Sequence, residues 1–374
     1  MSTARIRSGE IAVRELSPAG ASTPAFLAAW DALAINASEP NPFFEGWFAQ
    51  PSLIHLETGA PTALIAVYDD GALIGIVPAA QRRSYYGYLV PHVAVWLHDN
   101  AFCSVPLVAR GLECQFWRAL LQHLDHSAGR ALFLHLPQLP ADGSVCRALD
   151  SVLAETGRPA FTVGAEERAM LASNECPETY LAQSMSAKKR KELRRQRNRL
   201  GEEGALTFER CSDAQAVEAW VEEFLALESA GWKGDVGSAL ASAAATRNFF
   251  AQALTGAAHA GRLERLTLRL DGQAIAMLVN FITPPGMFSF KTAFDERFAR
   301  YSPGLLLQIE NLNLLARTDI AWADSCAAEG HSMIERVWRE KRRLITRNIA
   351  IGGSARRLLF KALMAYETRD RSPS

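Results

Sequence analysis

The 374-residue sequence lacks the features that mark several large classes of proteins. Its 40 Lys and Arg residues are balanced by 40 Asp and Glu residues, so it has no basic excess of the kind that general nucleic-acid binders carry. No apolar run reaches the roughly 18 residues that a membrane-spanning helix needs. The longest candidate, residues 274–282, contains Asn280. The N-terminal residues include no apolar segment of a secretory signal peptide.

The sequence also lacks a cysteine framework and the common catalytic signatures. Its six cysteines are scattered and form no Cys-x-x-Cys pair, which argues against structural disulfides and zinc sites. No Walker loop, Ser-His-Asp elbow or cluster of metal ligands stands out, so we expect no bound metal. These absences together favour a reduced, cytoplasmic protein.

The length predicts about two domains, and the hydrophobic content of 49% is enough for sizeable cores. Apolar periodicity and turn residues in the second half predict the order β-α-α-β-β-β-α-β-α-β, followed by a helix from residue 354. The predicted elements cover residues 206–211, 213–229, 243–260, 263–270, 274–282, 288–294, 304–316, 320–326, 332–340 and 344–351.

The first half reads as a weaker copy of the second. Both halves place an Asp-Gly turn between two apolar strands, at Asp70-Gly71 and at Asp271-Gly272, which is a strong hairpin signal. Strands are expected at residues 11–16, 63–68, 72–79 and 131–136, and helices at 24–34, 42–50 and 112–124. We therefore predict a duplicated α/β fold with mixed central sheets flanked by helices. Its expected parts are an N-terminal domain at 1–170, a linker at 171–204 and a C-terminal domain at 205–374.

The linker contains a strongly basic helical stretch at residues 186–200. It has eight basic residues and one acid, and only Leu193 and Leu200 are sizeable apolar anchors. The stretch is either a solvated interdomain helix or a surface for an anionic partner. The candidate partners are a nucleotide-sugar diphosphate, the 3′-phosphate of coenzyme A, a tRNA backbone and an anionic lipid surface.

Residues 288–304 predict a strand, a charged loop and a helix start. Phenylalanines alternate with Ser289, Lys291 and Ala293, which is the period of a strand. Ser302 suits the N-cap of a helix and Pro303 its first position. Free backbone N–H groups and the helix dipole favour negative charge at such a start, so with two nearby arginines this stretch predicts an anion site.

The order and motifs of the second half resemble the GNAT acetyltransferases, and more narrowly the CelD-type enzymes of cellulose and exopolysaccharide synthesis, which are related to the FemAB-like tandem enzymes. Residues 188–200, 228–240, 288–304 and 324–338 carry the resemblance. It implies acetyl-CoA as the donor, with the cofactor bound by Arg297, Arg300, Ser302, Gly304 and Leu305. The chain departs from the usual GNAT pyrophosphate loop, because Arg300 to Gly304 contain one glycine where the family pattern has more.

Acyl transfer from a thioester to an amine needs a base for the amine, donors for the oxyanion and a proton for the leaving thiolate. A split between the central strands, which the GNAT fold provides, would offer backbone N–H groups for the oxyanion. We expect Asp295 to be the general base, or else a loop cap or salt-bridge partner. Tyr301 is either the proton donor to the thiolate or a packing residue. His331 is either a base at a helix start or a residue that forms hydrogen bonds within a loop.

Five further residues are candidates for acceptor binding. Lys291 either binds an anionic acceptor or solvates a face of the sheet. Trp232 and Lys233 are expected to stack and pair with a sugar or nucleotide, with a core plug as the alternative for Trp232. Asp324 either orients His331 or caps a turn, and Arg336 stands where the related tandem enzymes often have a lysine. Cys326 lacks a base partner, so we do not expect a cysteine nucleophile.

Three hypotheses follow from these residues and the resemblance. The leading one is an acyl-CoA-dependent N-acyltransferase, with acetyl as the expected acyl group, that acts on an amino sugar in free, nucleotide-linked or lipid-linked form during surface-polysaccharide synthesis. Under this hypothesis the protein could also contact an anionic membrane or a synthase complex at its surface. DNA is not an expected partner. The second uses aminoacyl-tRNA as the donor, and the third is a non-catalytic scaffold of a polysaccharide synthase.

Overall fold

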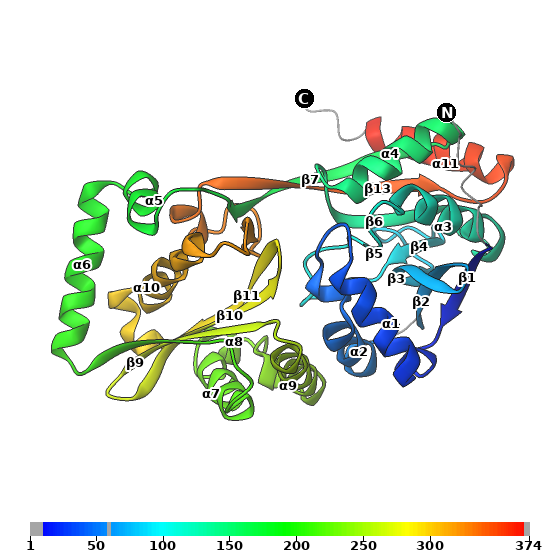
Figure 1. Ribbon diagram of the computed structural model, residues 1–374. Helices are drawn as coiled ribbons and strands as arrows, with labels where there is room; N and C mark the ends of the chain where they lie inside the picture. The colour runs from blue at the N-terminus through cyan, green and yellow to red at the C-terminus, as the bar shows by residue number, and fades with distance from the viewer. Residues whose placement is uncertain (1–9, 58–60, 370–374) are drawn as a thin grey trace, which may run out of the picture. The chain divides into compact units, whose positions relative to one another are not determined.

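A computed structural model describes residues 10–57 and 61–369 and divides the chain into two compact units (Figure 1). Unit 1 comprises residues 1–53, 57–166 and 343–374, and unit 2 comprises residues 54–56 and 167–342. Each unit holds a mixed β-sheet flanked by helices (Figure 1). The predicted α/β fold class is confirmed.

The strands of unit 1 lie in the order β1-β2-β3-β4-β6-β13, and β5 pairs with β3. All neighbouring pairs described here are antiparallel except β4 and β6, which are parallel. The strands are β1 (Ile11–Leu16), β2 (Thr62–Asp69), β3 (Ala72–Arg82), β4 (His92–Val95), β5 (Leu107–Val108), β6 (Phe133–Pro140) and β13 (Glu340–Ala350). The helices are α1 (Pro24–Ile35), α2 (Gly46–His55), α3 (Glu113–Ser127), α4 (Ser144–Thr156) and α11 (Ser354–Arg369).

The strands of unit 2 lie in the order β8-β9-β10-β11-β12-β7, and only β11 and β12 pair in parallel. The strands are β7 (Ala160–Leu171), β8 (Leu206–Cys211), β9 (Leu263–Leu270), β10 (Gln273–Thr283), β11 (Gly286–Phe294) and β12 (Trp322–Asp324). The helices are α5 (Pro177–Ser184), α6 (Ala187–Glu202), α7 (Val217–Ser229), α8 (Trp232–Asp235), α9 (Ala244–His259) and α10 (Pro303–Glu310). Short 3₁₀ turns include η4 (Glu296–Tyr301), η5 (Asn311–Ala316) and η6 (Ile334–Arg336).

The two sheets share one topology, which supports the predicted duplication. Each has four antiparallel strands, a fifth strand parallel to the fourth, and an antiparallel sixth strand. The chain passes from unit 1 to unit 2 within β7 and returns within β13. The units therefore divide differently from the predicted domains: residues 343–374 belong to unit 1, because β13 pairs with β6, and the basic helix α6 lies wholly in unit 2.

Both Asp-Gly hairpins form as predicted. Asp70 and Gly71 have φ values of 47° and 80°, and Asp271 and Gly272 have values of 49° and 80°. Two consecutive residues with positive φ are typical of a type I′ turn, whose twist matches that of the two strands it joins. The hairpins β2–β3 and β9–β10 were therefore encoded locally.

The segment after β12 differs from its prediction. Instead of a helix over residues 332–340, the chain forms the 3₁₀ turn η6 and enters β13 at Glu340. Ile334, Val337 and Trp338 are buried there, in a core cluster of unit 2 that also contains Met287. Burial of these side chains determines the path of the segment, because most helical stability in proteins comes from tertiary packing. The helix expected at 304–316 likewise ends at Glu310 and continues as η5.

No helix in residues 10–57 and 61–369 is both long enough and apolar enough to cross a membrane.

The pairing of β11 with β12 requires a residue without a side chain at Gly286, which can be tested. A Cβ atom at this position would lie 2.5 Å from two ring carbons of Trp322, the residue opposite it on β12. We expect Gly286→Ala to lower the free energy of unfolding by about 1–3 kcal/mol, the usual cost of overpacking. Denaturant unfolding of the full chain measures this. Gly201→Ala is the matched control, because a Cβ at Gly201 meets nothing within 4 Å. Equal stability of the two variants would contradict the close strand approach.

Candidate functional site

The parallel strands of unit 2 form a fork. Residues 286–288 of β11 pair with residues 322–324 of β12, and β12 ends there while β11 continues to Phe294. The register of β10 against β11 shifts between Val279 and Asn280, so β11 has one extra residue, Phe290, just past the fork. A bulge beside the end of a strand pair is a common way to redirect side chains at functional sites.

Asp324, for which the sequence predicts either a contact with His331 or a turn cap, fixes the fork. Its side chain is fully buried. One carboxylate oxygen lies 3.1 Å from Nη1 of Arg342, and the other lies 3.6 Å from Nη1 of Arg168 and accepts the N–H of Cys326 at 2.8 Å. A buried carboxylate needs such partners to remain charged. It caps the turn at Cys326, as one of the two alternatives proposed, and nothing places it beside His331.

Asp295, the predicted general base, caps η4. Its carboxylate accepts the backbone N–H of Arg297 at 3.0 Å and forms a bidentate pair with the guanidinium of Arg297, whose shortest contact is 2.6 Å. Hydrogen bonding to this guanidinium holds the pKa of the Asp295 carboxyl below its usual range. A carboxylate with a lowered pKa is a weak base, so these contacts favour the alternative of a loop cap.

Arg300 and Tyr301 share one partner, Glu203, just beyond the end of α6. Nη2 of Arg300 lies 2.6 Å from Oε1 of Glu203, and the Tyr301 hydroxyl donates to the same oxygen. The guanidinium also lies over the Tyr301 ring, 4.7 Å from its centre. Hydrogen bonding to Glu203 raises the pKa of Tyr301, so the phenol remains protonated at neutral pH. The ring is buried, which agrees with the packing alternative.

The start of α10 lies directly after these residues. Ser302 has the left-handed φ of 56° and its side chain makes no capping hydrogen bond, so the predicted side-chain cap is not formed. Gly304 and Leu305 are buried. A Cβ at Gly304 would lie 3.2 Å from the ring of Phe294 and 3.4 Å from the sulfur of Met333, so the glycine allows close packing here.

The remaining predicted site residues differ in their contacts with this region. The backbone N–H of Trp232 donates to Glu296 at 2.9 Å, so α8 meets the loop after β11. Trp232 is 56% exposed and is therefore not a core plug, whereas Lys233 pairs with buried Glu228 at 2.7 Å. Lys291 is half-buried and lies over the Phe290 ring.

His331 and Arg336 are both exposed. His331 lies in a turn before η6, not at the start of an α-helix, because the expected helix at 332–340 does not form. Met333, two residues later, packs against the start of α10.

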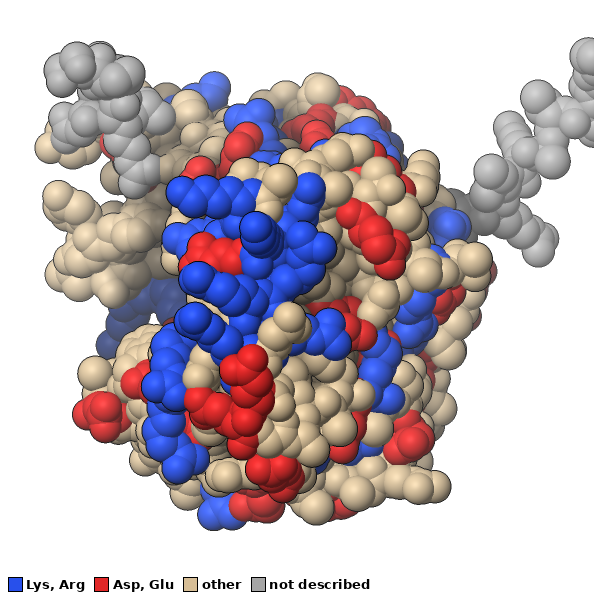
Figure 2. Space-filling model, turned by 90° about the vertical axis from the view of Figure 1, so that its left-hand side faces the viewer, with Lys and Arg blue, Asp and Glu red and all other residues tan. Residues whose placement is uncertain are grey.

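The basic helix α6 forms with Ser186 as its N-cap and docks on unit 2 through Leu193 and Leu200. Lys and Arg side chains cover its outer face in a dense patch (Figure 2). Six of its exposed cations have no ion-pair partner among the residues that the structure describes; they are Lys188, Lys191, Arg194, Arg195, Arg197 and Arg199.

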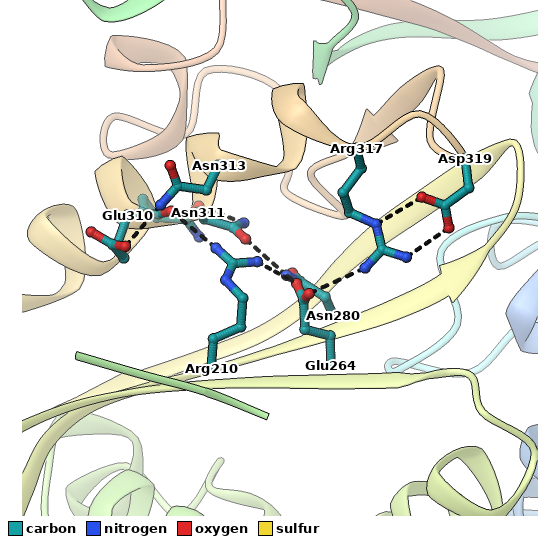
Figure 3. A network of polar contacts seen from close by, with 9 residues as sticks. Arg210, Glu264, Asn280, Glu310, Asn311, Asn313, Arg317 and Asp319 are labelled. Atoms are coloured by element: carbon teal, nitrogen blue, oxygen red, sulfur yellow. Dashed lines mark hydrogen bonds and ion pairs between the residues drawn. The ribbon is translucent and has the colours of Figure 1, made fainter. Parts of the chain in front are cut away.

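A buried polar network within unit 2 was not predicted (Figure 3). The carboxylate of Glu264, on β9, accepts from Arg210 at 2.7 Å, from Asn280 at 3.0 Å and from Arg317 at 3.4 Å. Asn280 gives a sequence signal for it, as a polar residue within the apolar run of β10, whereas Glu264 gives none, because β9 also contains Arg265, Thr267 and Arg269.

The network continues toward the fork. The Asn280 amide donates to Asn311 at 2.8 Å, Asn311 lies 3.5 Å from Gln308, and the Gln308 amide donates to the Thr292 hydroxyl at 3.4 Å. Thr292 lies on the part of β11 beyond the end of β12. The polar chain thus reaches from the middle of the sheet to the strand that forms one side of the fork.

Comparison with known proteins agrees with this architecture. The family described as the acetyltransferase (GNAT) domain matches residues 187–333, which include the fork, η4 and α10. Residues 187–333 thus form a domain of the GNAT acetyltransferase fold. A search of curated proteins gives no match.

Three solved structures resemble nearly the whole chain. FemX is 11% identical with a TM-score of 0.55, over 89% of this chain and 98% of that one. The C-terminal domain of a putative lysylphosphatidylglycerol synthetase from Agrobacterium fabrum is 15% identical with a TM-score of 0.54, over 90% and 96%. A conserved protein of unknown function from Bacteroides thetaiotaomicron is 12% identical with a TM-score of 0.52, over 86% and 97%. At these identities the likeness concerns the fold alone.

The contacts of Asp324 predict a large effect of its neutralisation on stability. Asp324→Asn would remove the buried negative charge that Arg168 and Arg342 both contact. We expect it to lower the free energy of unfolding by about 3–5 kcal/mol. Asp319→Asn is the control: Asp319 also pairs with an arginine, but it is 47% exposed, so its loss should cost under about 1 kcal/mol. Similar unfolding midpoints for the two variants would contradict this role of Asp324.

Proposed function

We propose that unit 2 is an acyl-CoA-dependent N-acyltransferase, with acetyl as the acyl group. The observation that carries the proposal is the fork of β11 and β12 inside the segment that matches the GNAT acetyltransferase domain. We assign the thioester carbonyl to this fork, where backbone N–H groups of β11 would donate to the oxyanion. The transfer forms a bond from the acceptor nitrogen to the carbonyl carbon and breaks the carbon–sulfur bond; the proton of the nitrogen passes to a base, and the sulfur leaves as a thiolate that takes up a proton.

We assign the coenzyme A pyrophosphate to the start of α10 and to Arg300. A helix N-terminus and a guanidinium both favour phosphate oxygens. In the structure Glu203 occupies the guanidinium of Arg300, so the phosphate would replace this carboxylate. Arg297, Ser302, Gly304 and Leu305 complete the proposed donor site; the cofactor would approach a loop with a single glycine.

Tyr301 is the proposed proton donor to the leaving thiolate. Its hydroxyl now donates to Glu203, which raises its pKa and makes it a weaker acid, so this role requires that binding of the donor release the hydroxyl from Glu203. Asp295 and His331 remain proposed bases for the acceptor amine. For Asp295 this role requires that binding of the substrates release the Arg297 guanidinium, which now lowers the pKa of Asp295.

The proposed acceptor is an amino sugar, in free, nucleotide-linked or lipid-linked form. The exposed indole of Trp232 could stack on a sugar ring, and its backbone contact with Glu296 keeps it beside the loop after β11. Lys233 and Lys291 would supply positive charge for an anionic acceptor, and exposed Arg336 is a further proposed contact. Asp324 is buried, so its proposed role there is to hold the fork in place. A role in surface-polysaccharide synthesis in the cytoplasm rests on the resemblance to the CelD-type sequences.

Calorimetry with acetyl-CoA tests the donor assignment. Arg300→Ala should weaken binding about tenfold, because a hydrogen bond to a charged group contributes roughly 1.5–3 kcal/mol. Arg247→Ala is the matched control, since Arg247 is also exposed and pairs with Glu222 at the same distance of 2.6 Å. Absence of acetyl-CoA binding by the wild type, or equal binding by the wild type and Arg300→Ala, would overturn the assignment.

A second candidate donor is aminoacyl-tRNA, favoured by one observation. The cations on the outer face of α6 form an extended convex surface, which fits a phosphodiester backbone better than a single phosphate group (Figure 2).

Filter binding of total tRNA at several salt concentrations tests this alternative. A Lys191→Ala/Arg195→Ala/Arg199→Ala variant should lower the slope of log affinity against log salt by about one for each lost phosphate contact. A control variant carries Arg118→Ala/Arg247→Ala, at two exposed arginines that already have carboxylate partners. Transferase activity that survives ribonuclease treatment would exclude tRNA as the donor.

A further inference from the structure

Unit 1 presents a small, rigid loop whose outer side is apolar. The loop, residues 82–89, begins at the last residue of β3 and forms most of the connection to β4. Tyr85 and Tyr88 exchange backbone hydrogen bonds of 2.8 and 3.0 Å, and Tyr86 and Gly87 between them have φ values of 45° and 87°. The pattern is that of a two-residue hairpin turn, which holds its tip in one conformation.

Tyr85 anchors the loop to the interior of unit 1. Its side chain is buried, and its hydroxyl contacts Asn348 at 2.9 Å and Glu367 at 3.1 Å. The ring packs in a core cluster with Phe360 and Met364 of α11. The loop therefore does not need to order itself when it meets a partner, and this lowers the entropic cost of binding.

The other large side chains of the loop point into solvent. Tyr86 is 68% exposed, Tyr88 is 70% exposed and Leu89 is 88% exposed. Three adjacent apolar or aromatic side chains on a rigid turn are costly to leave in water, and such a group marks an interaction site. Leucine supplies apolar area, and tyrosine places an apolar ring with a polar tip, which is the combination that suits a membrane interface.

Cations lie beside these apolar side chains. Arg82 and Arg83 begin the loop, and together with Leu89 and Arg130 they line one open cleft with a volume of about 1340 Å³. Among residues 10–57 and 61–369, none of the three guanidinium groups has a carboxylate partner. Glu15 also lines the cleft, but it pairs with His123 at 2.8 Å. The cleft is therefore positively charged.

We propose that the 82–89 loop docks unit 1 onto an anionic phospholipid surface. Tyr86, Tyr88 and Leu89 would enter the interfacial region, and the arginines would bind lipid phosphates, because guanidinium groups form paired hydrogen bonds with phosphate oxygens. Docking of this kind needs both apolar insertion and positive charge. Helix α6 carries charge without large exposed apolar side chains, so it lacks the first of these requirements.

This proposal is independent of the donor assigned to unit 2, because no residue of the 82–89 loop belongs to the proposed acyl-transfer site. Docking would hold the enzyme at a lipid surface whether or not its acceptor is lipid-linked.

Co-sedimentation of the full chain with vesicles tests the proposal. We expect wild-type protein to partition onto phosphatidylcholine vesicles that contain phosphatidylglycerol and only weakly onto pure phosphatidylcholine. Arg83→Ala should lower partitioning about fivefold, the effect of one cation near an anionic surface. Tyr88→Ser/Leu89→Ser should lower it about tenfold or more through lost apolar burial.

Two matched controls distinguish binding by this loop from the general effect of losing an exposed charge or an exposed apolar side chain. Arg118→Ala removes an exposed arginine that pairs with Glu155, and Ile35→Ser removes an apolar side chain that is 70% exposed on α1. Both should partition like the wild type. Equal partitioning onto the two kinds of vesicle, or no loss in Tyr88→Ser/Leu89→Ser, would overturn the proposal. So would a dimer in analytical ultracentrifugation that Leu89→Ser dissociates, which would assign the loop to a second copy of the chain.

Discussion

The buried carboxylate of Asp324 is the interaction on which the geometry of unit 2 depends. It is the last residue of β12, where β12 pairs with both β11 and β7, and its charge is balanced by arginines from β7 and β13. Beyond this residue β11 continues without β12. A buried charge tolerates little movement of its partners, since breaking such a pair costs several kcal/mol. The point at which β11 and β12 separate is therefore held in place, and the proposed oxyanion site lies next to this rigid point.

Much of the charge around the proposed donor site is already compensated within the protein. Asp295 forms an ion pair with Arg297, and Glu203 accepts hydrogen bonds from both Arg300 and Tyr301. A pyrophosphate that binds at Arg300 would therefore replace the carboxylate of Glu203 as the partner of the guanidinium. Exposed pairs of this kind contribute little to stability, so their exchange would cost little. The same compensation makes Asp295 a weaker base than its position in the sequence suggested.

The chain also separates its surfaces by chemical character. Helix α6 offers charge alone over its outer face, whereas the 82–89 loop of unit 1 combines exposed apolar side chains with arginines. The overall neutrality of the sequence hides both features, because its 40 acidic residues balance its 40 basic residues over the whole chain. Net charge therefore argued against a general nucleic-acid binder but could not describe local surfaces.

The sequence by itself determined the features that are local in origin. The Asp-Gly hairpins, the strand period of β11, the helix start at Pro303 and the basic helix all depend on residues that are neighbours in the chain. Their order was enough to predict a duplicated α/β fold.

Only the tertiary structure decided which strands pair with β7 and β13, that residues 332–340 form a turn around Trp338, and that Glu264 and Asn280 belong to one network. These outcomes depend on contacts between residues far apart in sequence, for which the free energy of burial and of pairing charges outweighs local preference. The partners of Asp295, Asp324 and Arg300 illustrate this most clearly: the sequence supplied the charged groups, and the packing of unit 2 decided which of them compensate one another.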